Sequence, residues 1–281
     1  MAKCRMKASL IAEAVKTISE AIEEHDPIKV YALVSGGNDS TVVSHLAANL
    51  GPRLDGLVHI NTGIGVEQTR EYTRKFSQWL NMPLIEKCGP RTYEDLVMEY
   101  GFPGPAAHRY MYSWLKERPL REVRREAQAG QQRRVMFITG VRRSESRRRM
   151  GHVAAVQRDG NTVWVAPIRE FTHRDIWDYR DKYKLPRNEV VEILHMSGEC
   201  LCGAFSKPNE LEWLSVFYPE VADRIKRLER RAHGAGIKSS HWGPQSSKEI
   251  RESPGPLCSG CAYASDSEPE IVLTTSSLSR A

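Results

Sequence analysis

The sequence predicts an α/β protein in which a mostly parallel sheet carries helices on both faces, and three observations lead to this prediction. Short β-branched, apolar runs alternate with longer amphipathic segments along the first half of the chain. The apolar runs are continuous, as in strands that are buried on both faces. With 281 residues, of which 40% are hydrophobic, the chain can bury one sizeable core and a smaller lobe.

The first four elements are a helix, a strand, a second helix and a second strand. Apolar residues recur at helical spacing over residues 7–24, which predicts an amphipathic helix. Residues 29–34 are β-branched and aromatic and predict a strand, as does the run over residues 57–60. The stretch STVVSHLAANL between these strands, residues 40–50, predicts a helix.

The same alternation continues and then changes. Helices are predicted for residues 66–80, 92–100 and 110–129, and strands for residues 83–87 and 134–140. Two runs in which apolar and polar residues alternate then meet across Asp159-Gly160, which is typical of a β-hairpin. A helix over residues 172–183 has Thr172 as its N-cap, and residues 209–233 predict one long charged helix.

The composition predicts three regions. Residues 1–195 form the main domain, residues 196–264 a helical region with cysteines, and the Ser-rich residues 265–281 a disordered tail. No apolar run reaches the length of a membrane span and the N-terminus lacks a signal-peptide core, so we expect a cytoplasmic protein without a membrane partner. The net charge of +6 permits a polyanionic ligand or nucleic acid without requiring either.

The stretch SGGNDS, residues 35–40, follows the first strand and opens the second helix, and we call it the glycine turn. The N–H groups of Gly36 and Gly37 can converge on an anion, and a helix N-terminus favours negative charge. A lone Gly-Gly pair is more often an ordinary turn. Here Asp39 adds a carboxylate for Mg²⁺ and Ser40 a hydroxyl for phosphate, so the sequence predicts a phosphate site.

Four blocks of the sequence resemble the PAPS reductase family of PP-loop ATP pyrophosphatases, in which PAPS is phosphoadenosine phosphosulfate. SGGNDS is similar to the PP-loop, and VAPIREFTHRDIWDYRDKYKLP to a later block. NTGIGVEQT resembles the second block, although Glu67 and Gln68 stand where the family has Pro and Glu. TGVRRSESRRR resembles the third block. The resemblance covers roughly residues 29–186 in the family's order.

The resemblance implies a sheet of the adenine nucleotide alpha-hydrolase type and a glycine turn that binds ATP, PAPS or adenosine phosphosulfate (APS), with Mg²⁺. Asp39, Arg142 and Arg149 are the predicted catalytic residues, since guanidinium groups bind phosphate or sulfate oxygens bidentately. The predicted nucleotide-binding residues are Ser35, Gly36, Gly37, Asn38, Asp39, Ser40, Thr62, Gly63, Gly140, Arg142, Ser146 and Arg149.

Four of the six cysteines form two close pairs, Cys200 with Cys202 and Cys258 with Cys261. Two such pairs can share one metal centre, which leaves a 4Fe–4S cluster, structural zinc and unligated thiols as alternatives. The resemblance favours the cluster, because several branches of the family carry one, including assimilatory APS reductases and enzymes that put sulfur into the DNA backbone. Cys4 and Cys88 are predicted to be spectators.

The family's sulfonucleotide reductases use a cysteine in a C-terminal Glu-Cys-Gly-Leu-His segment, and no cysteine follows Cys261 in this sequence. The leading hypothesis is therefore a sulfurtransferase that adenylylates an acceptor with ATP before sulfur displaces AMP. Nucleic acid is one candidate acceptor, and a sulfur or electron donor protein is the expected partner. The alternatives are reduction of PAPS or APS to sulfite, and a nucleotide-binding Fe–S sensor or subunit. The sequence leaves the oligomeric state open, with a homodimer as one option.

Overall fold

The computed structural model describes residues 8–145 and 153–243 of the chain. Within them a six-stranded sheet has the strand order β3-β2-β1-β4-β6-β5. The strands are β1 (Lys29–Leu33), β2 (Gly56–Asn61), β3 (Leu84–Cys88), β4 (Val135–Ile138), β5 (Val156–Asp159) and β6 (Thr162–Val165). All neighbouring strands pair in parallel except β5 and β6, which form the predicted hairpin. The predicted mostly parallel sheet is confirmed.

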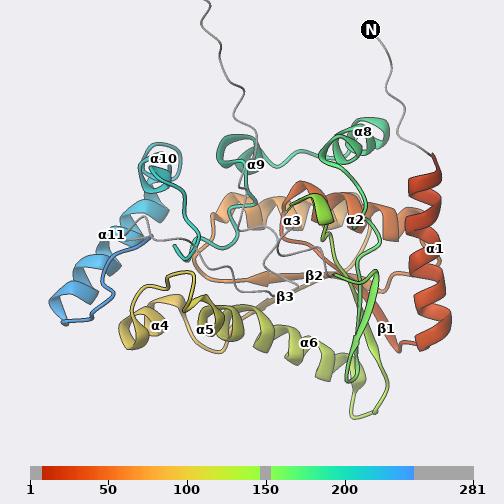
Figure 1. Cartoon of the computed structure of the whole chain (residues 1–281), viewed down its shortest axis with the longest axis horizontal. Coiled ribbons are helices and arrows are strands. Elements are labelled where there is room, and N and C mark those ends of the chain that lie inside the picture. The colour runs from red at the N-terminus through yellow and green to blue at the C-terminus, as the bar shows by residue number, and fades with distance from the viewer. Residues whose placement is uncertain (1–7, 146–152, 244–281) are drawn as a thin grey trace, which may run out of the picture.

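Helices cover both faces of this sheet, as predicted (Figure 1). Buried residues of α1, α2, α3 and α8 share one cluster with β1, β4 and β6, while α6 packs on the opposite face. None of the helices within the described residues is long and apolar enough to cross a membrane. The helices are α1 (Ala8–His25), α2 (Asn38–Asn49), α3 (Glu67–Trp79), α4 (Tyr93–Tyr100), α5 (His108–Tyr112), α6 (Arg118–Gln128), α8 (His173–Tyr183), α9 (Glu189–Leu194), α10 (Glu210–Phe217) and α11 (Pro219–Gly234).

Two predicted helices are interrupted, and a proline stands at each interruption. Residues 110–129 form α5, a π-helical turn over Ser113–Glu117 and α6. Pro119 lacks an N–H and its ring clashes with the carbonyl four residues earlier, so a wider turn replaces the α-helical ladder there. Pro219 likewise separates α10 from α11 within residues 209–233. The short helix α9 was not predicted, because six residues are too few to show a period.

A second apolar cluster joins the segment after residue 195 to the α/β part of the chain. Buried residues of α4, α10 and α11 meet there with Cys202 and with residues just after β2. In Figure 1, α11 lies between α10 and α4, at the end of the molecule away from α1. The division of the chain at residues 195 and 196 stays a prediction.

Asp55, just before β2, stabilises the start of β1 through a hydrogen bond and ion pairs. Its Oδ2 accepts the backbone N–H of Val30 at 2.8 Å, and its carboxylate forms ion pairs with Lys29 at 3.2 Å and Arg53 at 3.0 Å. Burial raises the pKa of Asp55, but the bonds from Val30, Arg53 and Lys29 outweigh this effect and the net pKa is lowered. The carboxylate therefore stabilises the folded state above its unfolded pKa.

We expect Asp55→Asn to lower the free energy of unfolding by about 1–3 kcal/mol at pH 7, because a charged hydrogen-bond acceptor is lost. Because the folded pKa is the lower one, the difference from the wild type should vanish as the pH falls through the folded pKa. Urea unfolding at several pH values measures both effects. Asp159→Asn, on the exposed end of β5, is the control and should change the stability by less than about 0.5 kcal/mol. An Asp55→Asn variant as stable as this control would contradict the expectation.

Candidate functional site

The glycine turn connects β1 to α2, as predicted, and its two glycines have different roles. Gly36 has a φ of +78°, and a Cβ atom there would lie 2.7 Å from Cγ2 of Thr69. Gly37 is the N-cap of α2 with a φ of −77°, and a Cβ there would lie 3.5 Å or more from its neighbours. The backbone conformation and the close approach of Thr69 therefore require glycine at position 36. At position 37 the surrounding described residues leave room for a side chain.

The N-terminus of α2 is suited to an anion. Gly37 has no side chain to cap the first N–H groups of α2, so these groups are available to a ligand. The hydroxyl of Ser40 donates to the carbonyl of Gly37 at 2.9 Å and accepts the N–H of Ser35 at 3.2 Å. The Ser40 hydroxyl thus stabilises the turn through hydrogen bonds to its backbone. A phosphate that binds this hydroxyl would compete with those two hydrogen bonds.

Asp39 and Arg142 form an ion pair with each other. Arg142 follows β4 and is only 4% exposed. Its Nε lies 2.9 Å from Oδ1 of Asp39, and its Nη2 donates to Oδ2 at 3.0 Å. The sequence predicted that Asp39 binds Mg²⁺ and that Arg142 binds phosphate. Because both carboxylate oxygens already face the guanidinium group, Mg²⁺ at Asp39 would compete with Arg142.

Two buried residues that the sequence analysis missed hold the glycine turn from the side of α8 and α9. Arg180, on α8 and 5% exposed, donates from Nη1 to Oδ1 of Asn38. Asn188, the N-cap of α9 and 4% exposed, donates from Nδ2 to the carbonyl of Gly36 at 2.9 Å. A signal for Arg180 was present, since it lies four residues after the core residue Ile176 on the same helix face.

Among the remaining described residues of the predicted nucleotide set, Gly140 lies against the glycine turn, whereas Thr62 and Gly63 follow β2. A Cβ at Gly140 would lie 2.8 Å from the backbone nitrogen of Ser40, so this glycine lets the end of β4 approach α2. Thr62, after β2, donates its N–H to Oε1 of Glu199 at 2.8 Å. Gly63 has a φ of +77° and open space around it. Ser146 and Arg149 lie outside the described residues.

Residues Ser197–Cys202, which we call the cysteine segment, begin alongside the glycine turn. A Cβ at Gly37 would lie 3.6 Å from that of Ser197, and the carbonyl of Ser197 accepts the hydroxyl of Thr69 at 2.6 Å. Three residues span at most about 11 Å, so Cys200 lies within that distance of Ser197 along the chain. The structure therefore places Cys200 within about 11 Å of a residue that lies against the predicted phosphate site.

Side chains from distant parts of the chain hold the cysteine segment in place. The hydroxyl of Tyr93 donates to the carbonyl of Cys202 at 2.9 Å, and Nε1 of Trp242 donates to that of Leu201 at 2.8 Å. Both bonds use backbone carbonyls. Cys202 is buried and Cys200 half-buried.

Within the described ranges no three His, Cys, Asp or Glu residues are grouped to hold a metal ion. Cys4, Cys258 and Cys261 lie outside these ranges. Cys200 and Cys202 fit half of a four-thiolate centre, because thiolates are the donors that iron–sulfur clusters and structural zinc prefer. The ligand set of four cysteines stays a prediction. Cys88 ends β3 opposite Asn61, on the same edge of the sheet as the glycine turn.

Known proteins with similar sequences are named as reductases. A phosphoadenosine 5'-phosphosulfate reductase of Xylella fastidiosa (strain M23) is 26% identical over 180 residues, which cover 62% of this chain and 72% of that protein. The reductase of Xanthomonas campestris pv. campestris (strain B100) is 25% identical over 180 residues, with 62% and 70% covered.

Two solved structures show a more distant similarity. The PAPS reductase of Candida auris, in a phosphate complex, has 16% identity and a TM-score of 0.48, covering 69% of this chain and 95% of that one. The U34-tRNA thiolase NcsA of Methanococcus maripaludis, with its 4Fe–4S cluster, has 14% identity and a TM-score of 0.44, covering 82% and 77%. Residues 29–195 match the phosphoadenosine phosphosulfate reductase domain, and because this match spans more than half of the chain, the protein belongs to that family.

Proposed function

We propose that this protein binds an adenine nucleotide at the glycine turn and uses it in sulfur chemistry in which the cysteine segment forms part of the same site. One observation carries the proposal: the backbone of the cysteine segment starts against Gly37 and Thr69, at the N-terminus of α2. A nucleotide whose phosphates lie on that helix end would have Cys200 and Cys202 as near neighbours. Membership of the family supports an adenylyl nucleotide as the ligand.

The preferred reaction is adenylylation followed by sulfur transfer. An oxygen of the acceptor attacks the α-phosphorus of ATP, the bond to the β-phosphate oxygen breaks, and pyrophosphate leaves. A sulfide supplied by a donor protein then attacks the acceptor atom that carries this oxygen, the bond between that atom and the oxygen breaks, and AMP leaves with the oxygen. These steps need positioning and charge neutralisation more than covalent catalysis. The acceptor we favour is nucleic acid.

Several residues have a proposed role in this reaction. The N–H groups of Gly37 and of the first turn of α2 would hold the departing pyrophosphate, together with Arg142 and Arg149. Asp39 would orient Arg142, through the two contacts described above. A 4Fe–4S cluster held by Cys200, Cys202, Cys258 and Cys261 would supply a sulfur-binding or electron-transferring centre beside the nucleotide.

Reduction of PAPS or APS to sulfite is the second candidate, favoured by the names of the relatives. In that reaction a thiolate attacks the sulfate sulfur, the bond from sulfur to the phosphate oxygen breaks, and the nucleotide leaves. A second thiol then displaces sulfite from the thiosulfonate, which leaves a disulfide as the oxidised product. The two candidates use the same nucleotide site and differ in the bond that breaks.

The products distinguish the candidates. Anaerobically purified protein is incubated with ATP and Mg²⁺ plus single-stranded nucleic acid and sulfide, and separately with PAPS or APS and a dithiol. Pyrophosphate from ATP that depends on the acceptor supports adenylylation, and sulfite from PAPS or APS supports reduction. Binding of nucleotide with neither product would overturn both reactions and leave a nucleotide-binding sensor or subunit.

The metal centre is tested separately. We expect anaerobic protein to contain about four iron and four sulfide per chain, and Cys200→Ser or Cys202→Ser to lose most of this iron, since each cysteine is a proposed ligand. Iron and sulfide assays with a visible absorption spectrum make the measurement. Cys88→Ser is the matched control and should keep its iron. A colourless protein with about one zinc per chain would contradict the cluster.

A further inference from the structure

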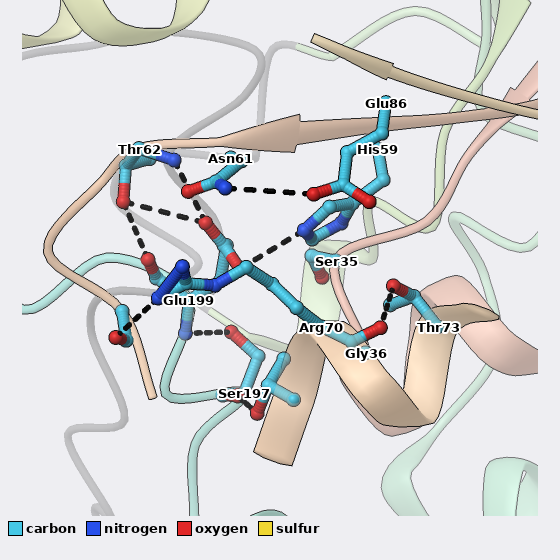
Figure 2. Close-up of polar contacts among 12 residues, drawn as sticks. Ser35, Gly36, His59, Asn61, Thr62, Arg70, Thr73, Glu86, Ser197 and Glu199 are labelled. Atoms are coloured by element: carbon cyan, nitrogen blue, oxygen red, sulfur yellow. Dashed lines mark hydrogen bonds and ion pairs between the residues drawn. The ribbon is translucent and has the colours of Figure 1, made fainter. Parts of the chain in front are cut away.

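A buried ion pair joins β2 to the cysteine segment. His59, on β2, is 0% exposed, and its Nε2 lies 3.1 Å from Oε2 of Glu199, which is 3% exposed. Figure 2 shows Glu199 between His59 and Thr62, whose N–H donates to the other carboxylate oxygen at 2.8 Å. The carboxylate is therefore held from two sides.

The geometry indicates that His59 is a charged imidazolium. Its Nδ1 lies 2.8 Å from the carbonyl oxygen of Val34, and its Nε2 faces the Glu199 carboxylate. Both ring nitrogens thus face acceptors, so both need a proton. The contact with Glu199 is an ion pair at close range, although the two groups are not aligned as an ideal hydrogen bond. Burial lowers the pKa of His59, but Glu199, the carbonyl of Val34 and the charge of Glu86 together raise it by more, in agreement with this charge state.

The ion pair connects the two segments of the proposed site, because His59 contacts a neighbour of the glycine turn and Glu199 belongs to the cysteine segment. Val34, which His59 contacts, immediately precedes Ser35 of the glycine turn. Glu199 immediately precedes Cys200. A buried ion pair is seldom more stabilising than apolar residues of similar volume, because both charges lose their hydration. Stability alone is therefore a weak explanation for two charges at this place.

We propose that His59 and Glu199 are positioning residues that couple nucleotide binding at the glycine turn to the conformation of the cysteine segment. This inference rests on the proposed nucleotide site. A phosphate that draws the turn's N–H groups toward itself would shift the adjoining carbonyl of Val34 and the imidazole bonded to it. Glu199 would follow, because its carboxylate faces His59 on one side and Thr62 on the other.

Peptide-resolved hydrogen exchange of the full-length protein, with and without ATP and Mg²⁺ or PAPS, tests the coupling. In the wild type we expect either nucleotide to slow exchange in the glycine turn and also in residues 197–204, the latter by about fivefold or more, the lower end of typical coupling between sites. In Glu199→Ala the turn should keep its protection and residues 197–204 should lose theirs. Residues of α1, whose buried side chains belong to the other apolar cluster, report general destabilisation.

Three further variants separate coupling from simple structural support. Glu199→Gln keeps an oxygen for the N–H of Thr62 and can donate to a neutral His59, so it should restore the coupling. The double variant His59→Leu with Glu199→Leu removes both charges together, leaves neither one unpaired, and should lose the coupling even if Glu199→Ala fails to fold. His45→Gln alters another buried histidine, on α2, whose Nδ1 lies 2.9 Å from the hydroxyl of Tyr179 on α8, and this variant should keep the coupling.

The outcomes are distinct. Nucleotide protection of residues 197–204 that persists in Glu199→Ala and in the double variant would overturn the coupling while leaving the nucleotide site intact. Equal loss in Glu199→Gln, His45→Gln and Glu199→Ala would also overturn it, since any core change would then suffice. A glycine turn that neither nucleotide protects in the wild type would overturn the proposed function and, with it, this inference.

Discussion

Gly36→Ala is expected to lower both the stability of the protein and its affinity for nucleotide. An alanine at a φ of +78° costs about 1–2 kcal/mol. Its Cβ would also lie 2.7 Å from Thr69 and 3.1 Å from Asn188. Such overpacking lowers the free energy of unfolding by about 1–3 kcal/mol more. Because Asn188 and Thr69 fix the turn, their displacement should also misplace the N–H groups of α2. Urea unfolding and calorimetric titration with ATP and PAPS measure the two losses.

Gly37→Val is the matched partner, and it should lose nucleotide binding without losing stability. Gly37 has an extended backbone that any residue adopts, and a Cβ there meets Ser35 and Ser197 at ordinary contact distances. The valine would instead occupy space in front of the α2 N-terminus, where we place the phosphates. Unchanged affinity in Gly37→Val would remove the turn from the site. A Gly36→Ala variant as stable as the wild type would contradict the steric argument.

Arg142→Lys is expected to weaken nucleotide binding by about tenfold or more, because lysine keeps the charge but loses the planar fork. In the structure that fork contacts both carboxylate oxygens of Asp39 and, through Nη1, the hydroxyl of Ser144 at 2.8 Å. A lysine can satisfy one of these contacts but not all three. The measurement is calorimetric titration with ATP and with PAPS.

Arg143→Lys is the control for Arg142→Lys. Arg143 is the next residue, but its side chain is half-exposed and pairs with Glu170 at 2.8 Å. An exposed pair of this kind contributes little, so the substitution should change nucleotide affinity by less than about twofold. Equal losses at Arg142 and Arg143 would show that the arginines act as a diffuse basic patch.

The fold was predictable wherever the signal was local. Continuous apolar runs identified the parallel strands, and the Asp159-Gly160 turn identified the hairpin, because these patterns reflect burial and backbone twist at the residues themselves. The helix interruptions were missed although Pro119 and Pro219 are visible in the sequence. Apolar residues keep their helical spacing across both prolines, so periodicity alone did not show the breaks.

The candidate site was predictable only in part, because its contacts join distant residues. The glycine turn could be identified, since its six residues carry the motif. The partners of that turn could not be identified from the sequence. Asp39 meets Arg142 across 103 residues, and the carbonyl of Gly36 meets Asn188 across 152. Likewise nothing near Glu199 in the sequence indicates that its carboxylate meets His59, since tertiary packing alone brings β2 to the cysteine segment.

The two outermost strands of the sheet limit how copies of the protein can associate. β5 ends in the exposed charged residues Arg158 and Asp159, and β3 carries Glu86 and Lys87, which form ion pairs with Arg74 at 2.8 Å and Glu126 at 2.6 Å. Charged side chains along a free strand edge oppose the addition of another strand, because pairing would strip them of water. A continuous sheet that runs across two copies of the chain, through either β3 or β5, is therefore disfavoured.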